Sequence, residues 1–349
     1  GVTVQSDEGD NRLIPISDKA PLELGEEFSN IVVVELKGLT SNTHHYTEKL
    51  DQFLESDIIK QHADDWPTSH DRMGDLILLK LKNEIRPYSE QIGMAILQQH
   101  KGVRLVLEDR GVVGEWRVRD LHPLTGRTST GDIVIAENLE NLETGTSVKE
   151  NGNNIWIDPA KVYYSPRLST ERLGTLKAAK ELNRRLGRPI IVADPYAGVG
   201  PSLIPLIVEA GLVGGILASD LNPVAVEFLK RNLIGRTQES MQITDLEEPI
   251  DWAIGCADAR QLKRNWAERF DLLLVNLPHD SLGHLEDLIP LMNSSSPNLI
   301  RGWAILEQGD IEDKKKFLQS ISVGESDLYS VRSYSPNQEF CVFEIRNNW

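Results

Sequence analysis

The chain has 349 residues, of which 40% are apolar and 26% charged, and its formal net charge is −16. The length predicts two or three globular domains, and the negative charge argues against non-specific nucleic-acid binding, which depends on Lys and Arg. The two cysteines, Cys256 and Cys341, have no short-spaced Cys/His cluster and indicate neither a disulfide framework nor a zinc site. Since no apolar run suits a membrane helix and the amino terminus lacks a signal-peptide pattern, we expect a cytoplasmic protein.

The first half of the chain has the pattern of small α+β domains. Residues 1–30 are polar and weakly patterned. The elements expected after them are a strand at 31–36, a short helix at 46–54, a strand at 75–81, a helix at 84–99, and strands at 103–107, 116–118, 132–136 and 154–164. A polar loop at 137–145 interrupts this half. We therefore place region boundaries at residues 65 and 165 and expect a catalytic domain over 166–349.

A basic helix is predicted to join the two halves of the chain. Thr170 is expected to cap it. Its apolar stripe comprises Leu173, Leu176, Ala179, Leu182 and Leu186. Between residues 161 and 188, eight Lys and Arg residues stand against two Glu residues. The sequence leaves open whether this basic face, with Arg184, Arg185 and Arg188, binds RNA or is a solvated helix surface.

From residue 189 onward, apolar strands alternate with helical segments in the doubly wound manner. The expected strands end near Asp194, Asp220, Asp258, Asn276 and Glu307, and an antiparallel pair follows at 328–334 and 340–345. This arrangement predicts an α/β fold of the class I Rossmann-like methyltransferase type. Its seven-stranded, mostly parallel sheet would end in an antiparallel hairpin and follow smaller α+β domains.

A glycine-rich turn follows the first of these strands and predicts a nucleoside site. Gly198 and Gly200 permit backbone amides to approach a ligand, and Asp220 has the spacing of an acid that binds ribose hydroxyls. A third glycine is missing, and Asp194 would repel a pyrophosphate but suits the ammonium group of S-adenosylmethionine. A structural glycine-rich turn is the alternative. The predicted cofactor contacts are Asp194, Tyr196, Gly198, Val199, Gly200, Asp220, Leu221, Asp258, Ala259 and Asn276.

Four motifs together resemble the tRNA guanine-37 N1-methyltransferase family of archaea and eukaryotes. They are Gly-Glu-Trp-Arg-Val-Arg at 114–119, Val-Tyr-Tyr-Ser-Pro-Arg-Leu-Ser-Thr-Glu-Arg at 162–172, Asp-Pro-Tyr-Ala-Gly-Val-Gly-Pro at 194–201 with Asp-Leu-Asn-Pro at 220–223, and Asn-Leu-Pro at 276–278. The resemblance covers residues 70–349. It implies tRNA as the partner, an RNA-binding domain over 66–165, and a divergent tRNA-recognition region over 1–65. We expect a monomer with no membrane contact and no obligate protein partner.

The resemblance also implies roles for single residues. Guanine N1 carries a proton at neutral pH, so its methylation requires a base and stabilisation of charge on O6. Glu171 is the expected base and Arg117 the expected O6 stabiliser, while Asn276 would orient the flipped-out guanine. Arg167 and Pro278 are further expected substrate contacts. The resemblance allows a magnesium requirement, but no carboxylate cluster has suitable ligand spacing, and no metal ligand is predicted.

Each role has a structural alternative, and two other functions remain open. An acid in the first turn of a helix is favoured by the helix dipole, and arginines on a strand often form solvated ion pairs. The first other function is aminocarboxypropyl transfer to a wybutosine precursor, although family members of that type lack the Asn-x-Pro motif and the Ser-Pro-Arg arginine that this chain has. The second is a non-catalytic RNA-binding protein, which should show a degraded glycine turn.

Overall fold

The computed structural model describes residues 5–6, 12–13, 45–114, 116–236, 242–243, 246 and 251–349. Contacts divide the chain into two units, Gly1–His44 and His45–Trp349. In the first unit, β1 (Gln5–Ser6) pairs with β2 (Arg12–Leu13) in antiparallel fashion. The strand expected at 31–36 and the motif residue Glu115 lie outside the described residues. None of the described helices is long and apolar enough to cross a lipid bilayer.

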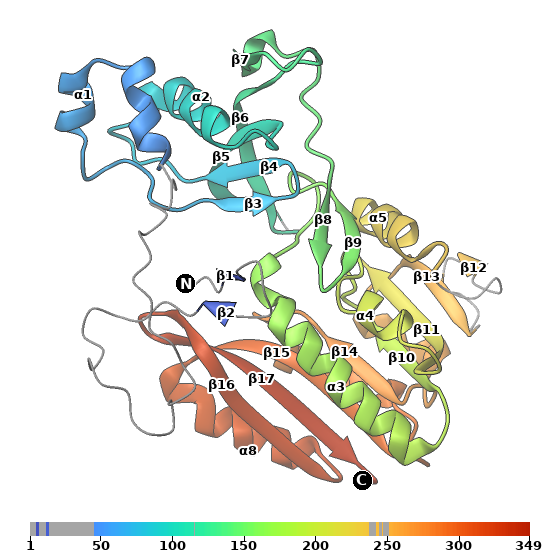
Figure 1. Ribbon diagram of the computed structural model, residues 1–349. Coiled ribbons are helices and arrows are strands. Elements are labelled where there is room, and N and C mark those ends of the chain that lie inside the picture. The colour runs from blue at the N-terminus through green and yellow to red at the C-terminus, as the bar shows by residue number, and fades with distance from the viewer. Residues whose placement is uncertain are drawn as a thin grey trace. The chain divides into compact units, whose positions relative to one another are not determined.

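The second unit begins with a five-stranded sheet in the order β3-β4-β5-β6-β7. Its strands are β3 (Asp71–Met73), β4 (Leu76–Leu79), β5 (Leu105–Val113), β6 (Val118–Arg127) and β7 (Ile133–Ile135). Its helical segments are η2 (Tyr46–Gln52), α1 (Ser56–Gln61), η3 (Arg86–Tyr88), α2 (Ser89–Gln99) and η4 (Ala136–Asn138). Helix α2 covers one face of the sheet (Figure 1), where Ile92, Ala95 and Ile96 are buried. The α+β composition predicted for this half of the chain is present.

The prediction of a strand at 116–118 is wrong for two of its three residues, since β6 begins only at Val118. Trp116 and Arg117 lie in the turn between β5 and β6, and Arg117 has a positive φ of 51°. Such a backbone conformation is sterically disfavoured in a regular strand. Arg117 and Arg119 are two positions apart, but they do not share one face of a strand, because only Arg119 belongs to β6.

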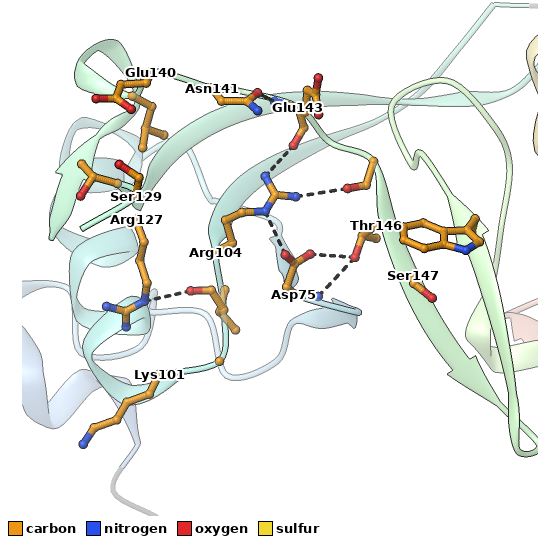
Figure 2. Close-up of a pocket in the computed structure, with 16 residues that line it drawn as sticks. Asp75, Lys101, Arg104, Arg127, Ser129, Glu140, Asn141, Glu143, Thr146 and Ser147 are labelled. Atoms are coloured by element: carbon orange, nitrogen blue, oxygen red, sulfur yellow. Dashed lines mark hydrogen bonds and ion pairs between the residues drawn. The ribbon is translucent and has the colours of Figure 1, made fainter. Parts of the chain in front are cut away.

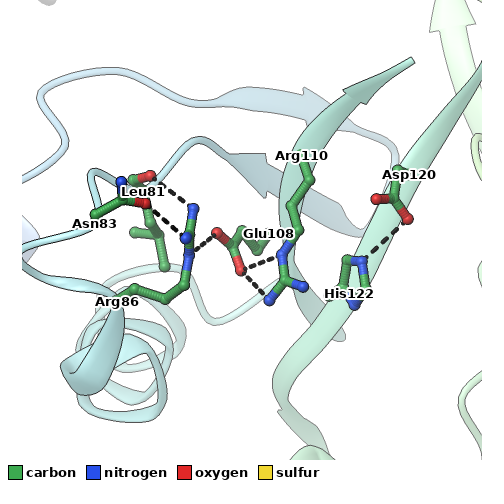
Figure 3. A network of polar contacts seen from close by, with 7 residues as sticks. All are labelled: Leu81, Asn83, Arg86, Glu108, Arg110, Asp120 and His122. Atoms are coloured by element: carbon green, nitrogen blue, oxygen red, sulfur yellow. Dashed lines mark hydrogen bonds and ion pairs between the residues drawn. The ribbon is translucent and has the colours of Figure 1, made fainter. Parts of the chain in front are cut away.

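A buried carboxylate fixes two arginines on this sheet. Glu108 of β5 is 1% exposed, and its Oε1 accepts a hydrogen bond from Arg86 Nε at 2.8 Å (Figure 3). Its Oε2 accepts from Arg110 at 2.8 and 2.9 Å. A buried charge is tolerated only when it is paired and hydrogen-bonded, so these two arginines serve the packing of η3 against β5.

A hairpin and a long helix connect the small sheet to the large one. The hairpin is β8 (Thr146–Glu150) with β9 (Asn153–Ile157), and η5 (Pro166–Leu168) precedes α3 (Ser169–Leu186). Thr170 was expected to cap α3, but the helix starts at Ser169 and Thr170 lies inside its first turn. Leu173, expected in the apolar stripe, is 44% exposed, because the buried face runs through Thr175, Ala179 and Leu182.

The large sheet has the strand order β12-β13-β11-β10-β14-β15-β17-β16. Its strands are β10 (Ile190–Asp194), β11 (Val213–Asp220), β12 (Gln242–Ile243), β13 (Trp252–Cys256), β14 (Leu272–Val275), β15 (Asn298–Glu307), β16 (Glu325–Ser335) and β17 (Gln338–Asn347). Strands β10 to β15 are parallel, whereas β17 is antiparallel to both β15 and β16. The predicted seven strands and terminal hairpin are confirmed, and the two-residue β12 adds an eighth at one edge.

Helical segments cover both faces of this sheet (Figure 1). They are α4 (Ile204–Ile207), α5 (Pro223–Leu233), η6 (Ala259–Gln261), α6 (Lys263–Trp266), η7 (Ser281–His284), α7 (Leu285–Leu288), η8 (Ile289–Leu291), η9 (Gln308–Asp310) and α8 (Ile311–Ile321). Alternate residues of β14 enter two separate cores: Leu272 packs in the core that contains α3, and Leu273 in the core that contains α8. This burial on both faces is typical of parallel sheets.

An ion pair ties the end of α3 to the sheet. Asp271, directly before β14, is fully buried, and its carboxylate receives two hydrogen bonds from Arg188 at 2.7 and 2.8 Å. The backbone N–H of Ile191 donates a third at 2.9 Å. Arg188 was expected to contact RNA, but its guanidinium neutralises a buried acid inside the fold.

We expect the Arg188→Ala variant to be less stable than the wild type by about 1–3 kcal/mol, because Asp271 would remain buried without its cation. The lower part of the usual range applies because the Arg188 side chain is 43% exposed. Urea unfolding of both proteins measures the difference. Arg184→Ala is the matched control, since Arg184 is 71% exposed and contacts only a surface glutamate. Equal stability of the two variants would contradict the structural role of Arg188.

Candidate active site

The glycine turn after β10 is held by the acid at the end of β11. Asp220 Oδ2 accepts a hydrogen bond from the Gly198 N–H at 2.9 Å, and its Oδ1 accepts from the Asn222 N–H at 2.9 Å. Gly198 and Gly200 both have positive φ, 53° and 86°. A Cβ on Gly200 would lie 2.7 Å from Leu229 of α5, whereas one on Gly198 would meet nothing nearer than the Tyr163 carbonyl oxygen at 3.9 Å. Gly200 thus serves packing, and Gly198 leaves space above the turn.

Asp194, the last residue of β10, is a fully buried carboxylic acid. One oxygen accepts a hydrogen bond from the Tyr196 N–H at 3.3 Å. The other oxygen is buried and lacks a hydrogen bond of normal geometry, although the Asn276 amide lies close enough to lower the pKa of Asp194. Burial, with a smaller contribution from the negative charge of Asp220, raises the pKa of Asp194 to about 8. The site therefore holds a buried carboxyl group that a bound cation would stabilise in its ionised form.

Other predicted cofactor residues surround the carboxyl ends of the same strands. The Tyr196 hydroxyl lies 2.6 Å from His284 Nδ1, and burial raises the pKa of this phenol. Asp258 forms an ion pair with Arg260 at 3.0 Å, and the hydrogen bond from Arg260 lowers the pKa of Asp258. Val199 and Ala259 are buried, whereas Leu221 is 53% exposed beside Asp220. Strand order reverses between β10 and β14, and ligands of doubly wound sheets bind at this point.

The segment before α3 lies against the glycine turn. Asn222 Nδ2 donates to the carbonyl oxygen of Lys161 at 2.9 Å. Behind this segment, Glu150 of β8 is buried and accepts from the Tyr164 hydroxyl at 2.7 Å and from Arg172 at 2.5 Å. Burial, followed by the negative charge of Glu150, raises the pKa of Tyr164. This cluster fixes the start of α3, and local sequence patterns gave no indication of Glu150.

Glu171 lies in the first turn of α3, as expected, and is 5% exposed. Its Oε1 accepts a hydrogen bond from Arg332 of β16 at 2.6 Å, while its Oε2 is buried without a partner among the described residues. Arg167 does not contact the Glu171 side chain. Its guanidinium binds Asp71 of β3 at 2.9 Å, and its carbonyl oxygen accepts from Arg332 at 3.4 Å. Sequence analysis missed Arg332, which is separated from Glu171 by 161 positions.

Arg117 and the loop after β14 approach one another. Burial lowers the pKa of His279, and the positive charge of Arg117 lowers it further, so the two side chains are neighbours. The His279 ring lies 6.2 Å from the Tyr334 ring. Asn276 donates to the Ser202 hydroxyl at 3.2 Å, and the Pro278 carbonyl oxygen accepts from the Ile305 N–H at 2.7 Å. The loop that carries Asn276 and Pro278 is thereby attached to β15.

Arg119, in contrast, is not part of this group. It binds Asp109 at 2.5 Å and Asp71 at 3.3 Å. Asp71 therefore connects Arg119 of β6 with Arg167 at the start of the catalytic half. These ion pairs join the small sheet to η5, the segment directly before α3.

The basic face of α3 lies apart from Glu171. Arg184 is 13 positions further along the helix, which corresponds to roughly 20 Å. Seven of the eight Lys and Arg residues between 161 and 188 form ion pairs with carboxylates; the seven are Lys161, Arg167, Arg172, Lys180, Arg184, Arg185 and Arg188. Arg185 also lies over the Trp349 ring, 4.6 Å from its centroid. Most of the positive charge counted in this segment is thus compensated within the protein.

A cavity of about 840 Å³ lies elsewhere, beside the polar loop at 137–145 (Figure 2). Arg104 holds this loop by donating to the carbonyl oxygens of Glu143 at 2.7 Å and Gly145 at 3.2 Å, and it also pairs with Asp75. None of the predicted site residues lines the cavity. In the part of the chain that the structure describes, no group of three or more His, Cys, Asp or Glu residues is placed to hold a metal ion.

Comparisons with known proteins agree with this fold. The model of the TYW2 N-terminal domain matches residues 50–130, and that of the TRM5/TYW2 methyltransferase domain matches residues 146–293. The tRNA (guanine(37)-N(1))-methyltransferase Trm5b of Pyrococcus abyssi is 29% identical over 97% of this chain and 89% of its own length. The solved complex of aTrm5 and tRNALeu is similar over 99% of this chain and 92% of that chain, with a TM-score of 0.63 at 23% identity. The structure of P. horikoshii TYW2 in complex with MeSAdo is similar over 86% of this chain and 97% of that chain, with a TM-score of 0.60 at 19% identity.

The raised pKa of Asp194 predicts a specific pH dependence of stability. The unfolded chain releases the Asp194 proton near pH 4, whereas the folded protein retains it up to about pH 8. The stabilising contribution of this group is therefore present at low pH and is lost as the pH rises through that window. We expect Asp194→Asn to gain stability relative to the wild type between pH 5 and pH 8, as measured by urea unfolding.

Asp258→Asn is the control for this measurement. Because the pKa of Asp258 is lowered, its titration lies below this window, and its difference from the wild type should stay constant. Parallel stability curves for Asp194→Asn and the wild type would show that Asp194 is ionised in the folded protein at neutral pH.

Proposed function

The chain belongs to the TRM5/TYW2 methyltransferase family, and we propose from this premise that it transfers a methyl group from S-adenosylmethionine to N1 of guanosine 37 in tRNA. The observation that carries the proposal is the similarity to a tRNA (guanine(37)-N(1))-methyltransferase along nearly the whole chain. The positions of Glu171 in the first turn of α3, of Asn276 directly after β14 and of Arg117 near His279 support it, because guanine N1 methylation needs a base, a base-orienting group and a cation.

The cofactor lies over the glycine turn in this proposal. The ribose hydroxyls bind Asp220, whose oxygens retain acceptor capacity beyond the two backbone N–H groups that they already bind. The ammonium group of the methionine part approaches the buried oxygen of Asp194 that lacks a hydrogen bond of normal geometry. The exposed Leu221 side chain offers an apolar surface to the adenine, with Asp258 and Ala259 at its edge. Tyr196, Val199 and Gly200 shape the turn, and Asn276 borders the methyl group.

The chemical step uses residues from three parts of the chain. Glu171 accepts the N1 proton on Oε2, which is the oxygen left without a partner among the described residues. Arg117 stabilises the negative charge that develops on O6, and Asn276 and Pro278 orient the flipped-out base. Since all of these groups belong to one chain, a monomer is sufficient for the chemistry.

The tRNA backbone contacts that we propose are Arg167, Arg184 and Arg185. Residues 66–165 act with them as an RNA-binding domain, and residues 1–65 contribute to tRNA selection. The ion pairs of the basic face mean that each phosphate contact must compete with an internal carboxylate. The net charge of −16 makes such specific contacts more important than general attraction.

Aminocarboxypropyl transfer from the same cofactor is the second candidate. The match of residues 50–130 to the TYW2 N-terminal domain favours it. Asn276, Pro278 and Arg167 favour methyl transfer. They belong to the Asn-x-Pro and Ser-Pro-Arg motifs, which the aminocarboxypropyl-transferring members of this family lack.

We expect the wild-type protein, incubated with S-adenosylmethionine and unmodified tRNA that carries guanosine 37, to add one methyl group at N1. Mass spectrometry of the digested tRNA identifies the product. The matched control is the same tRNA with adenosine at position 37, which should remain unmodified. An added aminocarboxypropyl group would establish the second candidate instead, and an unmodified guanosine would overturn both.

Glu171→Gln keeps the size of the side chain but removes its basicity. We expect the single-turnover rate of methyl transfer to fall on the order of 10² to 10⁴-fold, whereas the affinity for S-adenosylmethionine should remain unchanged. Arg117→Ala should slow the same step by a comparable factor, and the double variant should lose less than the product of the two factors, because both residues act on one charge distribution. A near wild-type rate for Glu171→Gln would leave this residue as a helix-terminus acid only.

A further inference from the structure

Arg332 reaches from the edge strand β16 to the first turn of α3. Its NH1 donates to Glu171 Oε1 at 2.6 Å, and its NH2 donates to the Arg167 carbonyl oxygen at 3.4 Å. The guanidinium also lies over the Phe340 ring of β17, 4.5 Å from its centroid. Contacts with three separate elements restrict the position of this side chain, although it is 40% exposed.

The two oxygens of Glu171 have different surroundings. Oε1 is bound by Arg332, whereas Oε2 is buried and has no hydrogen-bond partner within the described residues. A buried carboxylate oxygen without a donor is costly, so such atoms call for a functional explanation. A base that must take a proton from a substrate needs one ionised oxygen free to accept it.

Other charged groups near Glu171 are committed elsewhere. From β16, the Tyr329 phenol is uncharged: burial, followed by the negative charge of Asp327 and with a smaller contribution from Glu171, raises its pKa. From α3 itself, Arg172 binds Glu150; from η5, Arg167 binds Asp71; and from β15, Arg301 binds Glu344 and Thr175. Within the described part of the chain, Arg332 is therefore the cation in direct contact with the Glu171 carboxylate.

We propose that Arg332 is a positioning residue for the base: its guanidinium compensates the charge of the buried Glu171 carboxylate and fixes Oε1, so that Oε2 faces the N1 proton of the guanine. This inference rests on the proposed function. In the step concerned, the proton passes from guanine N1 to Glu171 Oε2, the N1–methyl bond forms, and the methyl–sulfur bond breaks with its electron pair retained by sulfur. The negative charge of the carboxylate and the positive charge of the sulfonium are both removed, so the step balances.

The test is the pH dependence of the single-turnover rate on guanosine-37 tRNA. In Arg332→Ala, the buried carboxylate loses its cation and binds a proton more readily than in the wild type. We expect the rate at pH 7 to fall about 10- to 100-fold and the acidic limb of the profile to move to higher pH, so that part of the loss is recovered in alkaline buffer. Arg332→Lys keeps a cation and should restore most of the wild-type profile.

Three controls separate this role from a structural one. Lys316→Ala removes a 74% exposed cation of α8 and should leave the profile unchanged. The affinity for S-adenosylmethionine, measured by calorimetry, should be the same in all variants. In a Glu171→Gln background, Arg332→Ala should have no further effect on the rate, because Arg332 acts through Glu171.

A rate for Arg332→Ala that is lowered equally at every pH and is not restored by lysine would overturn the inference, as would full additivity with Glu171→Gln. Should Arg332→Ala fail to fold, Arg332→Lys and Arg332→Gln provide the same comparison of charged and neutral side chains. Failure of the proposed function is distinguishable, because the wild-type protein would then not methylate guanosine 37.

Discussion

The carboxylate of Asp220 holds together the two turns on which the site is built. It binds the backbone of the glycine turn after β10 through the Gly198 N–H, and it binds the start of α5 through the Asn222 N–H. Asn222 in turn attaches the segment before α3 through the Lys161 carbonyl oxygen. One acidic side chain at the end of β11 thus determines the distance between the cofactor turn and the segment that carries the proposed base.

Buried acids elsewhere in the second unit follow the same principle. Glu108, Glu150, Glu171 and Asp271 are each buried and each receive an arginine. Removing a charge from water is expensive unless a partner of opposite charge compensates it. An arginine that pairs with a buried acid contributes less positive charge to the protein surface. A count of basic residues in the sequence therefore overstates the positive charge available to bind tRNA.

Local patterns in the sequence were sufficient for the parts of the fold that local forces determine. The apolar strands of the large sheet, the positive-φ glycines and the acid of Asp220 all follow from the chemistry of short segments, and the structure confirms the mostly parallel sheet with its terminal antiparallel hairpin. The start of α3 could not be located in this way. Thr170 is a good capping residue, but Pro166 begins η5 immediately before α3, so the cap position falls on Leu168, two positions earlier than expected.

Local sequence patterns could not predict contacts between segments that are far apart in the chain. Arg332 is an isolated arginine on a mostly exposed strand, and only the pairing of Arg332 with Phe340 brings it over the sheet toward α3. Asp71 and Arg167 are similarly separated by 96 positions. The roles of Glu171, Asn276 and Arg117 came from family motifs, and the ion partners of these residues, which those motifs do not contain, had to come from the tertiary structure.

The position of β17 has a consequence for the order of events during synthesis. This strand follows β16 in the chain but lies between β15 and β16, and it hydrogen-bonds to both. While the ribosome is still adding residues 338–347, β16 has no neighbour in the sheet, and nothing in the sheet yet holds Arg332 in position to bind Glu171. A chain that has folded its glycine turn but not yet added β17 therefore still lacks the contact between Arg332 and Glu171, which forms only when the last strand is in place.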